Sequence, residues 1–474
     1  MLGLKHYGID MNAKELMQMG VPLGEPVQQA ISFIADYVLA GGDKERIRDE
    51  VNAVLSNPDE FKTDELRGAL AKALIESPNV VRTEAVPYRQ WGKDLEVEAV
   101  KQMERACYLP VSVAGALLPD AHLGYGLPIG GVLATEDAVI PYAVGVDIAC
   151  RMKMTVLDLP VKDFERKTDR LKGAIERETR FGIGASFKKR REHGVLDQDW
   201  TISPVTKRSK DKAWSQLGTS GSGNHFVEFG FFTAKEKIGG LEPGEYLALL
   251  SHSGSRGTGA QVCNHYSKLA MAAHADLPKE LKHLAWLDLA DESGAEYWAA
   301  MNLMGEYAAA NHACIHRHIA ENLGLEVLLD IENHHNFAWQ ETHEVAGETR
   351  EVIVHRKGAT PAGEGVLGII PGSMATPGFV VRGKGNPVSL DSASHGAGRV
   401  MSRTKASKTF KWKDVNQVLK NRGVELLSAG LDEVPGVYKD IHEVMDAQTD
   451  LVEVLGQFDP KLVKMAPHGE RPED

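Results

Sequence analysis

The sequence has 474 residues, of which 43% are hydrophobic and 25% are charged, and its formal net charge is −12. This length allows one large core or two to three domains, and the composition excludes a disordered chain. No apolar run approaches the roughly 18–20 residues that cross a bilayer, and the acidic balance argues against nucleic-acid binding over the whole surface.

The first part of the chain is predicted to be helical. The segments 26–40 and 61–77 carry apolar residues at helical spacing, and the first ends at a Gly-Gly pair. The stretch from Pro78 to Pro87 indicates a boundary. Residues 1–82 are therefore expected to form a helical N-terminal extension.

Beyond this boundary, short apolar runs are broken by glycines, as in EYLALLSHSGSRG and LGIIPGSM. Such runs are typical of buried strands that end in functional loops. Helical patterns interrupt them at 162–179, 280–323 and 414–428, without regular strand–helix alternation. These features predict an α+β fold, with a catalytic domain over residues 83–464 and a loose tail over 465–474.

Asp147 and Cys150 are three residues apart, which lets both reach one ion from a turn. Alone, this spacing is more typical of a buried structural cysteine. Four histidines strengthen the case for a metal centre, because each lies in a loop rich in Gly, Ser or Asn; they are His225, His252, His335 and His395. Glycines let the backbone approach an ion or a phosphate closely.

Oxygen, sulfur and nitrogen donors together favour zinc, manganese or iron over magnesium or calcium. Five donors exceed one tetrahedral site, so two ions that share a ligand are expected, and a thiolate can bridge them. Paired ions suit phosphoryl and nucleotidyl transfer. The four cysteines form no CxxC pair, which indicates a reducing compartment, and the chain begins without a secretory signal, so a cytoplasmic protein is expected.

A nucleotide would have to be held without a Walker-type loop, since GxxxxGK[ST] is absent from the sequence. Arg256, Arg356, Lys357 and Arg399 lie in glycine-rich segments and are predicted phosphate contacts. A histidine can carry the nucleotide covalently, because neutral imidazole is nucleophilic. Basic runs at 188–191, 207–212 and 399–413 are compatible with an anionic polymer, although each alone is more often a solvated face.

At these residues the chain resembles the RtcB family of RNA-splicing ligases, from about residue 85 onward. The resemblance is carried by long motifs of unusual composition: PDAHLGYG (119–126), VGVDIACRM (144–152), LGTSGSGNHFVE (217–228), SHSGSRGTG (251–259), HHN (334–336), RKGA (356–359), IIPGSMAT (369–376) and SHGAGRVMSRTKA (394–406). It implies the family's own fold, arranged around a deep metal-containing cleft.

The resemblance also implies roles for single residues. Asp147, Cys150, His225, His252 and His335 match manganese ligands, with Cys150 bridging two Mn²⁺ ions. His395 matches the histidine that becomes guanylylated, and Asp120 matches a further active-site carboxylate. The positions around the bound GMP are matched by Asn224, Phe226, Glu228, Ser373, Gly396, Ala397, Gly398, Arg399, Tyr438 and Lys464.

The implied activity is a GTP- and manganese-dependent joining of RNA 2′,3′-cyclic phosphate or 3′-phosphate ends to 5′-hydroxyl ends, in RNA repair or tRNA splicing. The need for an activating accessory protein is left open. Three departures from the family pattern stand out: Gly378 replaces a serine near the nucleotide, Met465 and nine more residues follow Lys464, and the first ~80 residues have no counterpart in compact bacterial members.

Two other functions fit part of the pattern. A dinuclear metal phosphoesterase acting on RNA ends would need the metal ligands, but neither GTP nor a nucleophilic His395. A non-enzymatic RNA-binding factor would be expected to have lost some ligands, yet all five ligand positions and the nucleophile are present.

Overall fold

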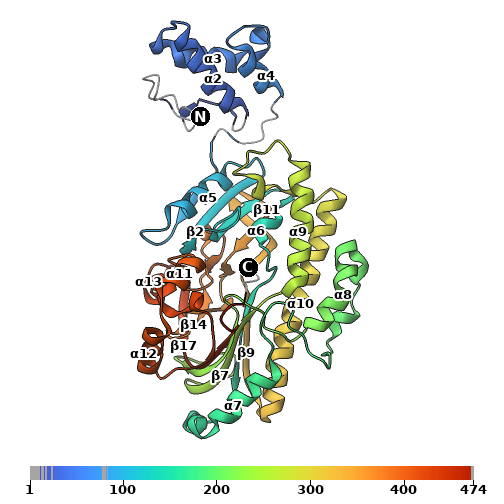
Figure 1. Ribbon diagram of the computed structural model, residues 1–474, viewed down its shortest axis with the longest axis vertical. Helices are drawn as coiled ribbons and strands as arrows, with labels where there is room; N and C mark the ends of the chain where they lie inside the picture. The colour runs from blue at the N-terminus through green and yellow to red at the C-terminus, as the bar shows by residue number, and fades with distance from the viewer. Residues whose placement is uncertain are drawn as a thin grey trace.

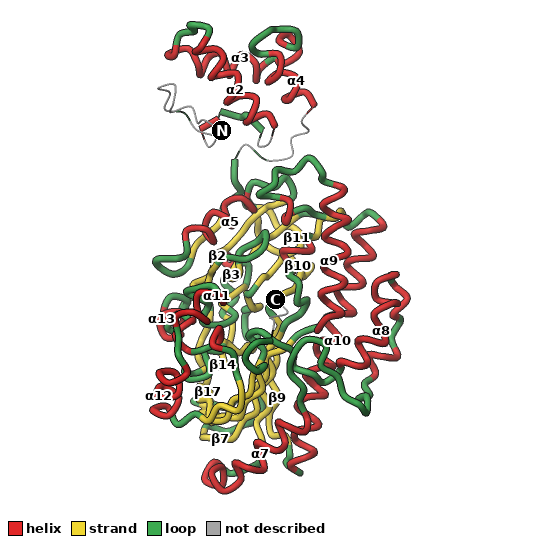
Figure 2. The backbone as a smooth tube through the Cα atoms, in the orientation of Figure 1, coloured by secondary structure: helices red, strands yellow, loops and turns green. Residues whose placement is uncertain are grey.

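The computed structural model describes residues 11, 15–16, 19–22, 25–76, 82 and 84–470. The described chain comprises a group of N-terminal helices and a larger α+β part (Figure 1). In the larger part, strands form the centre and long helices run along one side (Figure 2). The predicted α+β class is confirmed, and none of the described helices is long and apolar enough to cross a membrane.

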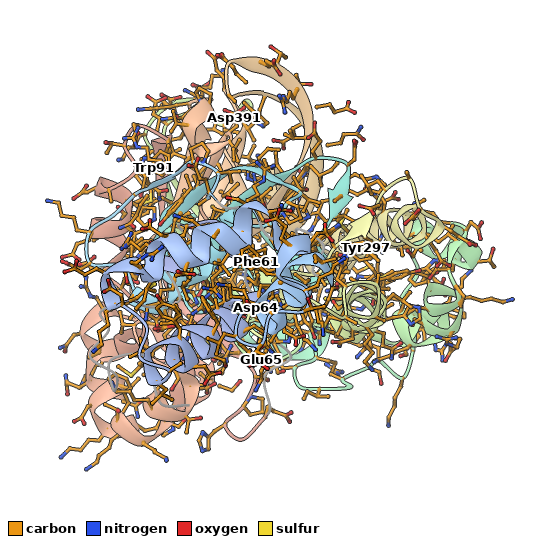
Figure 3. All side chains as sticks on the ribbon, turned by 90° about the horizontal axis from the view of Figure 1, so that it is seen from above. Phe61, Asp64, Glu65, Trp91, Tyr297 and Asp391 are labelled. Atoms are coloured by element: carbon orange, nitrogen blue, oxygen red, sulfur yellow. The ribbon has the colours of Figure 1, made fainter. Side chains whose placement is uncertain are left out.

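The N-terminal helices share a core of their own. They are α2 (Glu25–Leu39), α3 (Ile47–Ser56) and α4 (Gly68–Glu76). Phe33 and Ile34 of α2 pack with Val51 of α3 and Leu70 of α4, and all four are at most 2% exposed. Figure 3 looks down on this group, with Phe61, Asp64 and Glu65 labelled. Of the predicted boundary from Pro78 to Pro87, residues 78–81 and 83 lie outside the described residues.

The larger part is built on an eight-stranded sheet. Its path is β13-β14-β17-β6-β7-β5-β9, and β16 pairs with β17 beside this path. The strands are β5 (Arg151–Leu157), β6 (Phe226–Ala234), β7 (Gly244–Ser253), β9 (Val327–His334), β13 (Leu367–Ile370), β14 (Gly378–Gly383), β16 (Glu425–Ser428) and β17 (Val452–Met465). The edge strands β9 and β13 also meet, because the Asn333 amide bonds both the N–H and the carbonyl of Ile369. The sheet is therefore nearly closed into a barrel.

A second, five-stranded sheet has the order β1-β2-β3-β11-β10. Its strands are β1 (Tyr88–Gln90), β2 (Ser112–His122), β3 (Ile129–Thr135), β10 (Asn336–Val345) and β11 (Glu348–Lys357). Two further pairs are β4 (Ala138–Val139) with β8 (Leu287–Asp288), and β12 (Ala359–Pro361) with β15 (Ser392–Ser394). Since β9 and β10 are separated by His335 alone, the chain passes directly from one sheet to the other there.

Helices cover these sheets. They are α5 (Val97–Cys107), α6 (Pro141–Val144), α7 (Phe164–Glu178), α8 (Pro204–Gln216), α9 (Arg256–Ala273), α10 (Glu292–Leu323), α11 (Arg403–Thr409), α12 (Trp412–Arg422) and α13 (Ile441–Asp446). Helices α8, α9 and α10 lie along one side of the molecule (Figure 2). Ile315 and Ile319, one helical turn apart on α10, are buried against Leu247 and Leu249 of β7.

Several predicted helix limits need correction. The pattern over 280–323 contains a helix only from Glu292, because the chain before it forms the short strand β8. The pattern over 61–77 becomes helical only at Gly68. The pattern over 414–428 ends as helix at Arg422, where Gly423 takes a left-handed conformation (φ 64°) and strand β16 follows. At the other end, β17 continues through Met465, which is the first residue of the expected tail.

Candidate active site

The five predicted metal ligands come together at one end of neighbouring strands. Strand β5 lies between β7 and β9, with Arg151 opposite both Ser253 and His334. Cys150 and His335 flank these strand ends, and His252 is the residue before Ser253. Sheet register therefore brings together residues that are far apart in the sequence.

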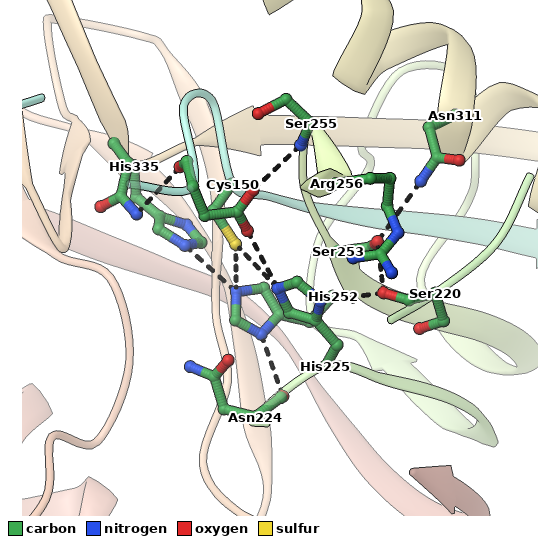
Figure 4. Close-up of polar contacts among 12 residues, drawn as sticks. Cys150, Ser220, Asn224, His225, His252, Ser253, Ser255, Arg256, Asn311 and His335 are labelled. Carbon is green, nitrogen blue, oxygen red and sulfur yellow. Dashed lines mark hydrogen bonds and ion pairs between the residues drawn. The ribbon is translucent and has the colours of Figure 1, made fainter. Parts of the chain in front are cut away.

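The donor atoms form two groups that share one sulfur (Figure 4). One group contains Cys150, His252 and His335, and the other contains Asp147, Cys150 and His225. The Sγ of Cys150 lies 3.1 Å from Nε2 of His252 and 3.5 Å from Nε2 of His225. Nε2 of His225 lies 3.0 Å from Oδ2 of Asp147, and the Nε2 atoms of His252 and His335 are 3.1 Å apart. All five residues are at most 9% exposed.

The histidine tautomers show that this cluster fits a cation. Nδ1 of His225 donates to the carbonyl of Ser220 at 2.8 Å, and Nδ1 of His252 donates to the carbonyl of Asn224 at 3.1 Å. In the neutral rings, Nε2 of His225 then directs a lone pair toward the thiol and the Asp147 carboxylate, and Nε2 of His252 directs one toward the thiol and Nε2 of His335. Several electron-pair donors thus face one another in a buried space, an arrangement that a positive charge between them stabilises. Burial lowers the pKa of His252 to about 3, so a proton is a poor candidate for that charge.

The turn between Asp147 and Cys150 is held in an uncommon conformation. Ala149 has a φ of +56°, which a residue with a Cβ seldom adopts. Its N–H donates to the carbonyl of Asn336 at 2.7 Å, and Oδ1 of Asp147 accepts from the N–H of Ser255 at 3.0 Å. These bonds offset the strain, and the turn directs the carboxylate and the thiol to the same point.

His395 lies beside this cluster, with its ring centroid 4.8 Å from that of His335. Its Nδ1 is 2.7 Å from Oδ2 of Asp120, and the same oxygen accepts the His395 backbone N–H at 3.1 Å. Burial alone would raise the pKa of Asp120, but the hydrogen bond from His395 and nearby positive charge outweigh it, and the pKa lies below its ordinary value. An ionised Asp120 therefore holds Nδ1–H and leaves Nε2 of His395 with a lone pair.

Gly398 closes this loop against the carboxylate segment. Its φ is +74°, and a Cβ there would lie 2.1 Å from the carbonyl oxygen of Asp120. The loop that carries His395 can approach Asp120 this closely only because position 398 lacks a side chain.

A cavity of about 500 Å³ adjoins His252 and His395. Most of the predicted nucleotide contacts line it: Asn224, Phe226, Glu228, Ser373, Gly396, Ala397, Gly398, Arg399 and Tyr438. Gly378 also lines the cavity, so the missing serine side chain would have faced it. Lys464 does not line it. Val463 and Met465 do, and because side chains alternate along a strand, Lys464 lies on the other face of β17, with Nζ 5.9 Å from the ring centre of Phe181.

Two buried carboxyl groups line the cavity. Burial raises the pKa of Glu228 well above its ordinary value, because a buried negative charge is poorly solvated. Glu433, 3% exposed, accepts from Arg399 at 3.2 Å and also contacts Arg403 and the hydroxyl of Tyr438. Sequence reasoning missed Glu433, although its position five residues before Tyr438 was the available signal.

All four predicted phosphate contacts have structural partners. Those of Arg399 are Glu433 and the carbonyls of Met401 and Asp432, and Arg399 also lines the cavity. Arg356 is 1% exposed, and its guanidinium bonds Glu341, the Ser392 hydroxyl and the Leu390 carbonyl, so the prediction of a phosphate contact there is wrong. Nζ of Lys357 donates to the carbonyls of Tyr125 and Tyr142. Arg256 is 2% exposed. Its Nε donates to Thr219, in the segment before His225.

Two of the four residues in the basic run at 188–191 likewise have structural partners. Arg191 is 6% exposed and bonds Glu178 and the carbonyl of Cys314. Arg190 pairs with Asp211 at 2.6 Å. Only Lys188 and Lys189 of this run have no hydrogen bond or ion pair among the described residues. In the run at 399–413, Arg399 and Arg403 line the cavity, while Lys405, Lys408, Lys411 and Lys413 are exposed.

A layer of buried polar residues behind the cluster was also missed. The Ser251 hydroxyl lies 2.7 Å from Nδ1 of His312 and 2.8 Å from Nε2 of His316, both on α10. Nε2 of His312 bonds the carbonyl of Ser253 at 3.0 Å. Both neighbours of His252 are thus tied to α10. The spacing of His312 and His316, one helical turn apart, was the signal in the sequence.

Comparison with known proteins agrees with this geometry. The chain matches the family described as tRNA-splicing ligase RtcB over residues 102–201 and 186–465. It is 33% identical to the RNA-splicing ligase RtcB of Escherichia coli K12, over 79% of this chain and 96% of that protein. It is 30% identical to the tRNA-splicing ligase RtcB of Methanococcus maripaludis, over 80% of this chain and 92% of that protein. The chain belongs to the RtcB family.

Proposed function

We propose that this protein is an RNA ligase that uses GTP and manganese to join RNA 2′,3′-cyclic phosphate or 3′-phosphate ends to 5′-hydroxyl ends. The observation that carries the proposal is the pairing of His395 with Asp120 at 2.7 Å, in the same cavity as His252 of the donor cluster. Relatives named as RNA- and tRNA-splicing ligases support RNA as the substrate. A phosphoesterase would leave this oriented histidine without a role.

In the first step, Nε2 of His395 attacks the α-phosphorus of GTP. A P–N bond forms, the bond from the α-phosphorus to the bridging oxygen breaks, and pyrophosphate leaves. Asp120 contributes by accepting Nδ1–H, which keeps the lone pair on Nε2 and stabilises the positive charge that develops on the ring. Arg399 and the backbone of Gly396–Gly398 line the space where the phosphate would lie.

In the next steps, the RNA 3′-phosphate oxygen displaces His395 from phosphorus, and GMP passes to the RNA end. The 5′-hydroxyl oxygen of the second RNA end then attacks the 3′-phosphorus, a phosphodiester forms, and GMP leaves. His395 is regenerated when GMP passes to the RNA end, and it is not needed for the final sealing step.

Two manganese ions would be held by the two donor groups that share Cys150. When bound, they would stabilise negative charge on phosphate oxygens during these transfers. The mixed donor set suits manganese but does not by itself distinguish it from zinc or iron, so the choice of manganese follows the family resemblance.

Glu228 is the residue that best accounts for guanine. Its carboxyl group lines the cavity and is 4% exposed. Guanine presents adjacent N1–H and N2–H donors, which the two oxygens of an ionised Glu228 would accept in parallel. These hydrogen bonds would lower the pKa that burial raises, because they stabilise the charged form. Adenine lacks this pair of donors. We infer that Glu228 distinguishes GTP from ATP, in a cavity where Gly378 and Lys464 supply no polar side-chain contact.

The test is covalent labelling of the purified protein alone. With manganese and GTP labelled at the α-phosphate, the protein should acquire label that is lost in mild acid and kept in base, as expected for a phosphoramidate. GTP labelled at the γ-phosphate should give none. The His395→Ala variant should form no adduct, yet should seal RNA that already carries a 3′-pp-G end. Label that persists in His395→Ala and maps to a lysine would contradict the mechanism.

A further inference from the structure

The rim of the cavity carries an apolar patch that the proposed reaction does not explain. Three large hydrophobic residues that line the cavity are exposed: Leu123 (52%), Tyr125 (65%) and Val400 (53%). Among the exposed large hydrophobic side chains of the described chain, Tyr125 is the only aromatic one. Water-exposed apolar groups at the mouth of a site usually mark a place where a ligand is bound.

The loop that carries Tyr125 is held firmly, although the ring itself is exposed. This loop joins β2 to β3. Its Gly124 exchanges two hydrogen bonds with the side chain of Gln102, at 2.6 and 3.0 Å. The N–H of Leu123 donates to Glu96 at 2.9 Å, and Nζ of buried Lys357 donates to the carbonyl of Tyr125. These hydrogen bonds hold the backbone of residues 123–125 in one conformation.

Two further features place the Tyr125 ring beside His283. Gly126 has a φ of +73°, and a Cβ there would lie 2.7 Å from the carbonyl oxygen of His283. The ring of His283 meets the ring of Tyr125 edge to face, with centroids 6.0 Å apart. His283 thus contacts Tyr125 from one side, while the residue remains 65% exposed and can accept another flat group.

We propose that Tyr125 is a stacking platform for the terminal base of the RNA strand that brings its 3′-phosphate to His395. This inference rests on the proposed function and adds a substrate-positioning residue to it. Stacking on an aromatic ring is a sequence-tolerant way to hold a base, because every base has a flat π-face. It suits an enzyme that must position a phosphate at a fixed nucleophile without reading one sequence.

Charge on the same rim is consistent with this occupant. Arg403 and Ser402 line the cavity at the start of α11, and Lys405 and Lys408 of that helix are exposed. A strand whose last base lies on Tyr125 would have lysines near its phosphates on a protein that is otherwise acidic. The combination of a base platform and nearby cations is what single-stranded nucleic acid requires.

The experiment compares Tyr125→Ala and Tyr125→Phe, with Leu269→Ala, an exposed hydrophobic residue outside the cavity lining, as the control. The probe is an RNA with a 3′-phosphate and 2-aminopurine as its terminal base. The full-length protein should quench this fluorophore on binding, Tyr125→Phe should retain the quenching, and Tyr125→Ala should lose it. Tyr125→Ala should also raise KM for sealing roughly 5- to 150-fold, the range expected for one lost stack. Leu269→Ala should change KM less than threefold.

A second RNA, abasic at its 3′-terminal nucleotide, separates stacking from other effects. Wild type and Tyr125→Ala should bind this RNA equally, because neither can form the stack. Labelling of His395 by GTP should be unchanged in Tyr125→Ala; a loss of labelling would mean that the ring holds guanine, and would overturn the assignment to RNA. Unaltered quenching in Tyr125→Ala would overturn it as well. Since quenching reports binding alone, it remains informative even if the protein forms no GMP adduct.

Discussion

Oδ2 of Asp120 accepts two hydrogen bonds from His395, one from Nδ1 at 2.7 Å and one from the backbone N–H at 3.1 Å. One carboxylate oxygen therefore fixes both the position of the residue and the tautomer of its ring. This relationship joins strand β2 to the loop after β15, two segments that are 275 residues apart.

Replacing Asp120 by Asn should slow adduct formation while leaving the fold intact. An amide of the same shape can donate to Nδ1, which moves the proton to Nε2 and removes the lone pair from the attacking atom. We expect the rate of GMP transfer to His395 to fall by about a hundredfold or more, with manganese content unchanged. A rate within a few fold of wild type, measured in single-turnover labelling, would show that Asp120 does not set the tautomer.

Cys150→Ala should remove both bound manganese ions, whereas single changes at the outer ligands should remove one. The reason is that Sγ belongs to both donor groups, while Asp147 and His335 each belong to one. Metal analysis after dialysis should give about two ions per wild-type chain, one for Asp147→Ala or His335→Ala, and close to none for Cys150→Ala. Full occupancy in Cys150→Ala is incompatible with a bridging thiolate.

The lysines on and after α11 are expected to contact RNA phosphates. Changing Lys405, Lys408, Lys411 and Lys413 to Ala should weaken RNA binding and leave His395 labelling unaffected. Each lost phosphate contact should lower the slope of log affinity against log salt by about one unit. Lys162→Ala with Lys235→Ala, two exposed lysines that do not line the cavity, is the charge control. An unchanged salt slope would show that the four lysines are only solvated.

Lys188 and Lys189 provide a second test of the RNA path. Arg190 and Arg191 are already paired with Asp211 and Glu178, so the four-residue run cannot act as a unit. If the path extends to this run, only the two lysines should affect the salt slope.

His355 should make the protein less stable in acid. Its Nε2 accepts from the N–H of Ile140 at 2.9 Å, so the ring must be neutral, and burial lowers its pKa to about 4. Because the pKa of an unfolded histidine is about 6.5, this contribution to stability is complete above that pH. It is lost as pH falls from 6.5 toward 4, and amounts to about 3 kcal/mol in total. His355→Gln, which can make the same bonds without titrating, should flatten the pH dependence of the urea midpoint.

The N-terminal helices should be dispensable for GMP transfer. Their core contains none of the metal ligands, and His395 and the cavity lining lie entirely beyond residue 95. A protein beginning at Glu84 should therefore bind manganese and label His395 as the full chain does, while its preference among RNA substrates changes. A soluble, metal-loaded truncate without labelling would refute this separation of roles.

The chemical groups of the site could be predicted from the sequence more reliably than the orientation of individual side chains. Glycine-rich loops at strand ends identified His225, His252 and His335, because such loops are where buried strands expose functional side chains. The position of Lys464 outside the cavity lining and the structural partners of Arg356 could not be predicted, for a different reason. Which face of β17 a residue occupies, and whether a guanidinium already has Glu341 beside it, depend on contacts between distant segments. The pattern and spacing of residues in the sequence do not specify those contacts.

Strand β17 has a consequence for how the protein is made. It lies between β14 and β6 within the eight-stranded sheet, and its Val463 and Met465 form part of the cavity wall. All five predicted metal ligands lie on or beside β5, β6, β7 and β9, which pair with one another without β17. The wall of the cavity, however, is incomplete until this strand is inserted. A nascent chain that has not reached residue 465 would therefore have the chemical groups of the site without its shape. Activity toward RNA would begin only after that strand has left the ribosome.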